Sequence, residues 1–463
     1  MREIPAVSGM DILEARESRA AHQKQMLSSE GSCLISFTMN IPGKVKISRL
    51  ILESFLEGAY RIDRQLKRGN VKILQREILT RKTGYEGFWL LDADPYHVKS
   101  QMIQIEISSD LGRLFDIDVV LHDMEHISRT ALGYSQRRCL ICDRPAHECA
   151  RSQSHNQTDL INKTQQIMKE FFYKKRAKHV AEAACKSMLY EVSVTPKPGL
   201  VDRCDNGSHS DMDFFTFIDS TAALTQEFFD FYFIGVKYRS SLPQQLFDLL
   251  RYPGMHAEDL MRDAAGGCNT HKGLIFSLGI LCSALGWHDA NEIEVSPEDL
   301  LIFCGKMAKE RLSAELLALS GETAGTGGER MFLASKHGGI RTEVAEGYPT
   351  ARNYGLPALS KYLKKGLTYN DAGVYTLLEI IAHAQDSNVF SRCGAGMQSM
   401  ISAQAQDLLK GPFPIDFKDI KSLNDYYVQL NISPGGSADL LAVTFFIHFL
   451  FLRKAGIPTV ILS

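Results

Sequence analysis

The spacing of apolar residues changes once along this 463-residue chain, at about residue 150. Before that point, short strand-like runs alternate with turn residues and with helical candidates such as ISRLILESFLEGAYRIDRQLKR. From about residue 177 onward, apolar residues recur at the spacing of one helix face. The pattern predicts an α+β domain with a mixed sheet, followed by an all-α domain. The expected strands are SCLISFTMNI, GFWLLDAD, MIQIEISS and LFDIDVVL.

A polar stretch poor in apolar residues, ARSQSHNQTDLINKTQQ, separates the two parts and is typical of a linker. A chain of this length is expected to form two or more domains on size alone. We therefore expect a first domain at residues 1–155, a linker at 156–178 and a second domain at 179–463.

Charge and composition exclude several classes of function. A formal net charge of −2 gives no electrostatic support for a general nucleic-acid or membrane-surface role. The first residues lack the apolar core of a signal peptide, and the most apolar run, LLAVTFFIHFLFL, is shorter than a membrane span. The ten cysteines are scattered rather than laid out as a disulfide framework, which favours a reducing cytoplasm.

Five glycine-rich polar segments fall between the predicted helices of the second part. Glycine allows backbone amides to approach a ligand closely, and a following helix N-terminus favours phosphate. Turn and capping chemistry explains any one such loop, but the joint occurrence of five favours a site for an anion. No P-loop pattern is present, so a nucleotide site would be built another way. The segments are 195–213, 266–273, 321–347, 386–396 and 431–441.

These segments carry the residue types that such a site needs. The candidate phosphate-binding cations are Lys197, Arg203, Lys272, Arg341 and Arg392. The carboxylates that could hold Mg²⁺ or a proton are Asp211, Asp213, Glu343 and Asp386. The histidines suited to proton transfer, with a structural role as the alternative, are His209 and His271. Further substrate-contact candidates are Asn269, Gly435 and Gly436.

In the first part, LGRLFDIDVVL places two aspartates two residues apart. Successive side chains of a strand alternate, so Asp116 and Asp118 share one face while Phe115, Ile117 and Val119 point to the core. Two carboxylates on one strand face can form a divalent-metal platform. The alternative is a solvated strand edge without a ligand.

Long motifs in the second part resemble one enzyme family. YEVSVTPKPGLVDRCDNGSHSDMDFFTF, GGCNTHKGLIFSLG, KHGGIRTEVAEGYP and SPGGSADLLA are similar to the signatures of the triphosphoribosyl-dephospho-CoA synthases. The resemblance implies that ATP and 3'-dephospho-CoA are substrates. It also implies that the 2'-hydroxyl of dephospho-CoA attacks C1' of the ATP ribose and releases adenine. In this reaction, the side chains suited to binding the triphosphate are Lys197, Lys272 and Arg341. The carboxylates suited to holding Mg²⁺ or acting as the base are Asp211, Asp213 and Glu343.

The first part resembles a second family through GRLFDIDV (112–119) and RRCLICDRPAHECARSQSH (137–155). These stretches are similar to the holo-citrate-lyase synthases, the phosphoribosyl-dephospho-CoA transferases, for which a nucleotidyltransferase-like fold is an expectation. The resemblance implies that a serine of the citrate lyase acyl carrier (gamma) subunit attacks the 5''-phosphate and pyrophosphate leaves. Asp116 and Asp118 would hold Mg²⁺, Gly112 would allow close approach of phosphates, and Arg113 would bind them.

The cysteine-rich stretch of the same motif has two interpretations. The Cys139-x₂-Cys142 pair, with His147, Cys149 and His155, has the composition of a structural zinc site. A second C-x₂-C is missing, which weighs against zinc. In the resembling family, Cys149, Arg151 and His155 could instead line the substrate channel.

Two rival functions remain at this point. One is a non-catalytic module that senses CoA or a nucleotide; the four aspartates of the two parts weigh against it, because like charges bring nothing to a binder of polyanions. The other is the same chemistry serving the carrier subunit of malonate decarboxylase.

Overall fold

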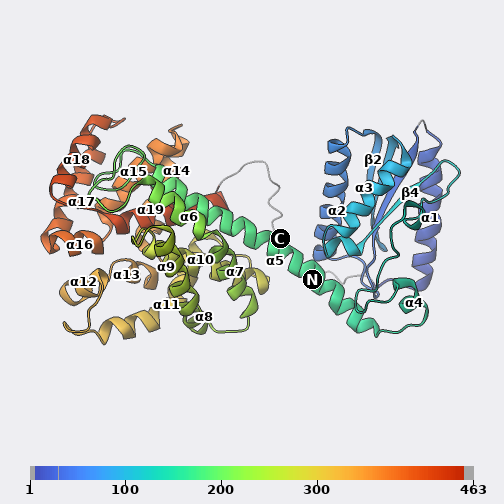
Figure 1. Cartoon of the computed structure of the whole chain (residues 1–463), viewed down its shortest axis with the longest axis horizontal. Helices are drawn as coiled ribbons and strands as arrows, with labels where there is room; N and C mark the ends of the chain where they lie inside the picture. Colours follow the sequence, from blue (N-terminus) through green and yellow to red (C-terminus); the bar gives the residue numbers. More distant parts are fainter. Residues whose placement is uncertain (1–5, 30, 453–463) are drawn as a thin grey trace. The chain divides into compact units, whose positions relative to one another are not determined.

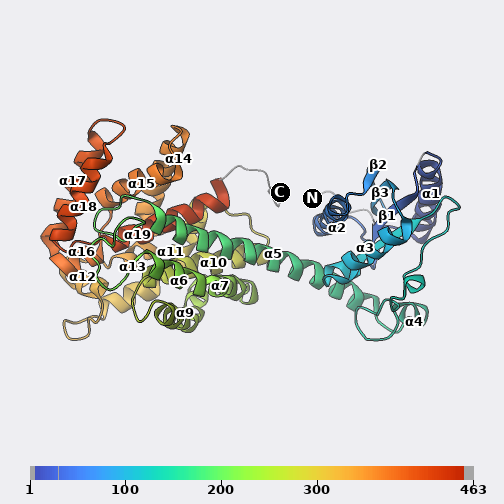
Figure 2. The ribbon, with the colours of Figure 1, turned by 45° about the horizontal axis from the view of Figure 1, so that its top comes forward.

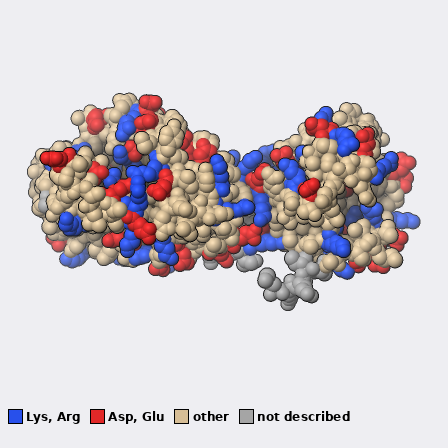
Figure 3. Space-filling view, turned by 90° about the horizontal axis from the view of Figure 1, so that it is seen from below, with Lys and Arg blue, Asp and Glu red and all other residues tan. Residues whose placement is uncertain are grey.

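The computed structural model describes residues 6–29 and 31–452. The chain divides into two compact units, Met1–Lys174 (unit 1) and Lys175–Ser463 (unit 2), which are described separately (Figure 1). On the face drawn in Figure 3, basic and acidic side chains are intermingled over both units, as the small net charge leads one to expect.

Unit 1 is an α+β unit built on one four-stranded sheet. The strand order is β2-β3-β1-β4, and every neighbouring pair is antiparallel, so the expectation of a mixed sheet was wrong. Its elements are α1 (Gly9–Leu27), β1 (Cys33–Met39), α2 (Arg49–Arg68), β2 (Lys72–Arg81), β3 (Gly84–Asp92), α3 (Pro95–Ile107), η1 (Leu111–Leu114), β4 (Phe115–Val120), η2 (Thr130–Leu132) and α4 (Ala146–Arg151).

Each face of this sheet is covered by helices (Figure 1). The larger core packs Ile35 and Phe37 of β1 against Phe55 of α2 and Met102 of α3. On the opposite face, Leu34 packs with the last residues of α1 in a smaller cluster. Alternation of side chains along β1 therefore supplies both cores.

Two sequence predictions in unit 1 fail for physical reasons. MIQIEISS, expected to be a strand, forms the end of α3 and the turn after it, because Asp94 caps this helix and Pro95 occupies its first position. Strand β2 was not predicted because it is an edge strand whose side chains are mostly exposed, so it lacks apolar periodicity.

The stretch expected to be a linker is helical. It belongs to α5 (Gln157–Ser193), a helix of 37 residues. In its first half, Ile167 and Met168 are buried in the larger core of unit 1, with Phe171 packed beside them. Apolar residues at helical spacing therefore continue through the polar stretch.

Unit 2 is helical throughout its described part. Its helices are the second half of α5, α6 (Phe214–Ala223), α7 (Thr225–Lys237), α8 (Pro243–Leu249), α9 (Arg251–Ala264), α10 (Lys272–Ala290), α11 (Pro297–Leu317), α12 (Gly327–Ser335), α13 (Ile340–Ala345), η3 (Ala351–Gly355), α14 (Leu356–Lys364), α15 (Tyr369–His383), α16 (Ser387–Cys393), α17 (Ala395–Lys410), α18 (Phe417–Gln429), α19 (Gly435–Ile447) and η4 (His448–Leu452).

Helix α10 is the centre of unit 2 and packs against α7, α9, α11 and α19 (Figure 2). Its crossing with α7 is close because both helices place glycine there: a Cβ at Gly235 would lie 2.0 Å from the Ser283 carbonyl oxygen. Among the described helices, α10 alone has the length and apolar composition to cross a membrane, and 78% of its apolar window is buried inside the protein. This burial is that of a core helix.

Candidate functional site

Unit 2 contains a cleft of about 930 Å³ into which three helices point their N-termini. Helices α10, α12 and α19 each place their first two residues in its lining, and five of these six residues are glycine. A helix N-terminus carries unsatisfied amides and a partial positive charge, which favour an anion. The six residues are Lys272, Gly273, Gly327, Gly328, Gly435 and Gly436.

A buried ion pair lies in the lining of this cleft. Lys197 Nζ donates to the Glu191 carboxylate and, at 2.9 Å, to the Glu191 carbonyl oxygen. The two side chains are only 1% and 3% exposed. Burial raises the pKa of Glu191, and the charge of Lys197 opposes that shift. Lys197, predicted to bind phosphate, is thus already engaged with a carboxylate that sequence reasoning missed.

His271 is buried beside this pair. Its Nδ1 forms a 2.5 Å hydrogen bond with Ser220 Oγ, which also accepts a hydrogen bond from Thr270 Oγ1 at 2.9 Å. Its Nε2 has no hydrogen-bond partner within the described part of the chain. Burial, aided by the charge of Lys197, lowers the pKa of His271 to about 3. Burial therefore favours the neutral imidazole, and the proton-transfer role expected for His271 stays a prediction.

Asp439 is a second buried carboxyl group in the lining. Burial raises its pKa well above the usual range, and the charges of Glu191 and Asp386 add to the effect. Its Oδ2 lies against the start of α10, since a Cβ at Gly273 would come within 1.9 Å of that atom. Glycine is thus required at position 273 for close approach of α10 to this carboxyl.

Several predicted residues line the outer part of the cleft. His209 Nε2 lies 2.9 Å from Ser433 Oγ, and its Nδ1 lies 3.7 Å from Asp211 Oδ1. Burial and the nearby Arg392 guanidinium lower the pKa of His209. Arg392 donates to the Ser208 carbonyl oxygen at 2.9 Å.

Two other predicted phosphate-binding residues of the lining, Lys272 and Arg341, form ion pairs with acidic side chains. Lys272 Nζ lies 2.9 Å from Glu258 Oε2, and Arg341 Nη1 lies 3.0 Å from Glu329 Oε1. Asn269 Oδ1 accepts a hydrogen bond from the Lys272 amide at 3.3 Å, which helps to start α10.

Four predicted residues lie outside the lining, and local structure accounts for each. Asp213 caps α6 and accepts a hydrogen bond from the Thr216 amide at 2.9 Å. Arg203 Nη2 donates to Asn370 Oδ1 at 3.0 Å.

The other two are buried carboxylates that organise loops. Glu343 accepts hydrogen bonds from the Thr350 hydroxyl at 2.6 Å and amide at 3.2 Å. Asp386 caps α16 and accepts hydrogen bonds from the Ser437 amide at 2.7 Å and hydroxyl at 3.1 Å. Burial raises the pKa of both carboxyls.

In unit 1, the predicted alternation along β4 is confirmed. Phe115, Ile117 and Val119 are buried, whereas the side chains of Asp116 and Asp118 are 40% and 43% exposed. The aspartates pair with Thr38 and Ser36 of β1, so they lie on the face covered by α1. Burial, reinforced by the Asp118 charge, raises the pKa of Asp116. Burial also acts on Asp118, but its hydrogen bond with His126 and the Lys99 charge outweigh it and lower its pKa.

Strand β4 is the edge of the sheet, and charged side chains satisfy its outer backbone groups. Lys99 Nζ donates to the Ile117 carbonyl oxygen at 2.8 Å, and Glu106 Oε1 accepts from the Ile117 amide at 3.1 Å. Arg137 Nη1 donates to the Phe115 carbonyl oxygen at 2.9 Å, and its Nη2 binds Glu106. Such pairing closes an edge that would otherwise be open.

These side chains also surround the two aspartates. Arg137 Nη1 lies 3.4 Å from Asp116 Oδ1, while Lys99 Nζ lies 3.6 Å and His126 Nδ1 3.7 Å from Asp118. The pair of carboxylates is therefore set among three cationic or titratable groups, a combination suited to a phosphorylated substrate and a divalent cation.

The other predicted residues of unit 1 have mainly structural contacts. Gly112 is needed for packing on α3, because a Cβ there would lie 2.5 Å from the Ile105 carbonyl oxygen. This contact with protein backbone accounts for the glycine, and a phosphate contact at Gly112 stays a prediction. Arg113 Nη2 donates to the Cys139 carbonyl oxygen at 2.8 Å, and Arg151 is exposed at the end of α4.

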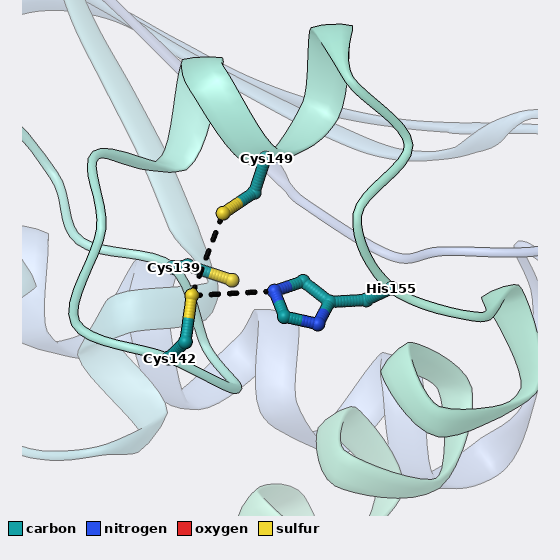
Figure 4. Close-up of side chains that lie close together, drawn as sticks. All are labelled: Cys139, Cys142, Cys149 and His155. Carbon is teal, nitrogen blue, oxygen red and sulfur yellow. Dashed lines mark hydrogen bonds between the residues drawn. The ribbon is translucent and has the colours of Figure 1, made fainter.

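The cysteine-rich stretch folds into one cluster (Figure 4). One ligand atom from each of Cys139, Cys142, Cys149 and His155 lies within 4.8 Å of the others. Cys142 Sγ lies 3.5 Å from Cys149 Sγ and 3.3 Å from His155 Nε2. The sequence grouping is confirmed for these four residues, whereas His147, which the sequence also suggested, is not part of the cluster.

Sequence reasoning missed six residues of the two sites. In unit 2 they are Glu191 and Asp439, and in unit 1 they are Lys99, Glu106, His126 and Arg137. Three of the six occur within the quoted motifs. One sequence signal could have indicated Asp439: it is a charged residue in the otherwise apolar start of a helix, SADLLA.

Comparison with known proteins identifies both units. Residues 177–456 match the family described as ATP:dephospho-CoA triphosphoribosyl transferase (CitG). Residues 7–171 match the family described as apo-citrate lyase phosphoribosyl-dephospho-CoA transferase (CitX).

Two similar proteins match almost the whole chain, and a third matches only part of it. A protein of Haemophilus influenzae named CitXG is 31% identical over 449 residues, with 95% of each chain covered. A CitXG protein of Leuconostoc mesenteroides subsp. cremoris is 32% identical over 456 residues, covering 95% of this chain and 96% of the relative. The 2-(5''-triphosphoribosyl)-3'-dephosphocoenzyme-A synthase of Pectobacterium atrosepticum is 38% identical over 262 residues, covering 57% of this chain and 86% of the relative. The chain therefore belongs to the CitG family, carries a CitX domain before it, and is a bifunctional transferase that makes triphosphoribosyl-dephospho-CoA and modifies apo-citrate lyase with it.

Proposed function

We propose that the cleft of unit 2 is where ATP and 3'-dephospho-CoA react. One observation carries this assignment: three helix N-termini with glycine in their first two positions converge on one cleft. The cleft also holds the buried carboxyl of Asp439 and His271 Nε2, which has no hydrogen-bond partner among the described residues. The amides of α10, α12 and α19 would hold the triphosphate without cleaving it. Lys272, Arg341 and Arg392 would exchange their present partners for phosphate oxygens.

Asp439 is the candidate general base of this reaction. Its carboxyl group lies in the lining of the cleft against the start of α10, and in its ionised form it can accept a proton from a substrate hydroxyl. It would accept the proton of the 2'-hydroxyl as the C1'–O bond forms and the bond from C1' to adenine breaks. Neutral His271 would contribute a hydrogen bond through Nε2, and His209 and Asp211 would contact substrate at the outer part of the cleft.

The local contacts of four other predicted residues support structural roles. Asp213 and Asp386 cap helices, Glu343 binds the loop at Thr350, and Arg203 holds Asn370. We therefore place them around the site rather than in contact with substrate.

In unit 1, Asp116 and Asp118 are proposed to hold Mg²⁺ during transfer. Their shared face and their exposure fit an ion that keeps several waters and binds through one or two carboxylates. When bound, Mg²⁺ would neutralise the phosphates of the substrate. Arg137 and Lys99 would orient the diphosphate as it leaves with the electron pair of the broken P–O bond. The acceptor would be a serine of the citrate lyase acyl carrier (gamma) subunit, and the reducing cytoplasm is the proposed location.

The assignment can be tested with the intact protein. We expect ATP, Mg²⁺ and dephospho-CoA to yield free adenine, detected by chromatography, in equal amount to the triphosphoribosyl product. Addition of apo-citrate lyase carrier should give a mass increase of one phosphoribosyl-dephospho-CoA group, while apo-malonate decarboxylase carrier should remain unmodified. Modification of the malonate carrier alone would contradict the proposed acceptor.

A further inference from the structure

The cysteine cluster of unit 1 has the donor set of a tetrahedral metal site. Three thiol sulfurs and one imidazole nitrogen converge from Cys139, Cys142, Cys149 and His155 (Figure 4). Zinc–sulfur bonds of about 2.3 Å and a zinc–nitrogen bond of about 2.0 Å imply S···S and S···N separations of about 3.8 and 3.5 Å in a tetrahedron. The corresponding distances of 3.5 Å and 3.3 Å are close to these values.

The backbone that presents the cysteines is also typical of a metal site. Residues 137–146 form a small turn closed by the Cys139 amide donating to the Arg144 carbonyl oxygen and the Ala146 amide donating to the Arg137 carbonyl oxygen, both at 2.8 Å. Within this turn, the Ile141 amide donates to Cys139 Sγ at 3.5 Å. Amides directed at sulfur stabilise a thiolate, which is the form that binds metal.

A disulfide does not explain the arrangement. The sulfurs of Cys142 and Cys149 lie 3.5 Å apart, which far exceeds the length of a disulfide bond, about 2.05 Å. The cysteines outside this cluster, all within the described residues, are free as well. A third sulfur and an imidazole beside that pair would have no purpose in a two-cysteine redox switch. Four soft or borderline donors without a carboxylate select zinc over Mg²⁺.

We propose that Cys139, Cys142, Cys149 and His155 bind one structural zinc ion that holds Arg137 beside Asp116. All four coordination positions are taken by protein, so the ion has no open position for substrate. Arg137 begins the turn that carries Cys139, and its guanidinium reaches the Phe115 carbonyl oxygen, Glu106 and Asp116. Arg113 ties the same turn to the start of β4 through the Cys139 carbonyl oxygen.

The metal content of the purified full-length protein tests the proposal without an activity assay. We expect about one zinc per chain by inductively coupled plasma mass spectrometry, and loss of most of it in Cys142→Ser and in His155→Ala. Cys204→Ser, which changes an exposed cysteine of unit 2, should retain the full zinc content. Full zinc content in both cluster variants would overturn the proposal.

Cobalt substitution provides a test that needs no variant to fold. Wild-type protein reconstituted with Co²⁺ should show the strong visible bands of a tetrahedral ion and near-ultraviolet thiolate-to-cobalt absorption. Zinc-free protein with Cys142 and Cys149 joined in a disulfide, found by non-reducing peptide mapping, would overturn the site.

The positioning of Arg137 has its own readout. Removal of zinc by a chelator should lower carrier labelling about tenfold or more while adenine release stays unchanged, and added zinc should restore labelling. Unchanged labelling in zinc-free protein would overturn the positioning role. Because adenine release is measured in the same sample, failure of this inference is distinguishable from failure of the proposed function.

Discussion

Lys197 and Glu191 form a buried ion pair in the lining of the unit 2 cleft, with both side chains almost fully shielded from solvent. Removing one partner leaves an uncompensated charge, which typically costs about 3–5 kcal/mol. We expect Lys197→Met to lower the free energy of unfolding of unit 2 by that amount. The double variant Lys197→Met with Glu191→Gln should recover part of it.

Denaturant unfolding followed by circular dichroism measures this difference. The matched control is Lys178→Met, because Lys178 and Glu182 form an exposed pair at 3.9 Å. That substitution should change the free energy of unfolding by no more than about 0.5 kcal/mol. Equal effects of the two lysine substitutions would contradict the importance of burial.

Lys272 tests the triphosphate assignment. Loss of a charged hydrogen bond of about 1.5–3 kcal/mol predicts that Lys272→Ala weakens ATP binding about ten- to hundredfold. Adenine release at limiting and saturating ATP separates binding from chemistry. Lys410→Ala, at the exposed end of α17, serves as the control. If Lys272 only forms its ion pair with Glu258, the Lys272→Ala variant will release adenine at the rate of the control at both ATP concentrations.

His271 should make stability depend on pH. Burial lowers its pKa in the folded protein to about 3, below the usual histidine value of 6.5. Between these values the unfolded chain binds a proton that the folded chain does not, so stability is lost as pH falls from 6.5 toward 3. From pH 8 to pH 5 this group contributes a loss of about 2 kcal/mol.

Urea unfolding of the wild type and His271→Gln at pH 8 and pH 5 checks the prediction. In both proteins, the free energy of unfolding also changes between pH 8 and pH 5 because carboxylates titrate. The difference between the two proteins in this change therefore isolates the contribution of His271. The loss of the free energy of unfolding should be about 2 kcal/mol smaller in the variant than in the wild type. Identical drops would show that His271 is protonated normally in the folded protein.

Separation of the units tests the proposed domain boundaries. A fragment of residues 1–174 should fold, whereas 1–165 should be less stable because it lacks Ile167, Met168 and Phe171 of the core. Buried side chains of this size each contribute about 1.5–3 kcal/mol. Thermal unfolding of the two fragments gives the comparison, and equal stability would place the boundary nearer residue 165.

Much of this fold could be predicted from periodicity. The α+β and all-α division, and the alternation that exposes Asp116 and Asp118, depend on local pattern and were confirmed. Strand β2 and the antiparallel order could not be predicted in the same way, because exposed edge residues carry no apolar pattern and pairing joins distant segments.

The sites were predicted less completely for a related reason. The glycine motifs indicated the cleft, since helix starts are local features. Asp439 and Arg137 act through contacts with residues far away in sequence, so spacing alone did not distinguish them from solvated or capping residues. For Asp213 and Gly112, the structure shows a helix cap and a close backbone contact, and caps and close packing use the same residue types as ligand sites.

The central claim is that the two reactions occur at two separate sites, and one pair of variants tests it most directly. Adenine release and carrier labelling should be measured on Asp439→Asn and Asp116→Asn, with Asp92→Asn as an exposed control. We predict that Asp439→Asn loses adenine release about a hundredfold or more yet labels carrier normally from pre-made intermediate, and that Asp116→Asn shows the reverse. A folded variant of either aspartate that loses both activities, or Asp439→Asn releasing adenine at the wild-type rate, would contradict the account.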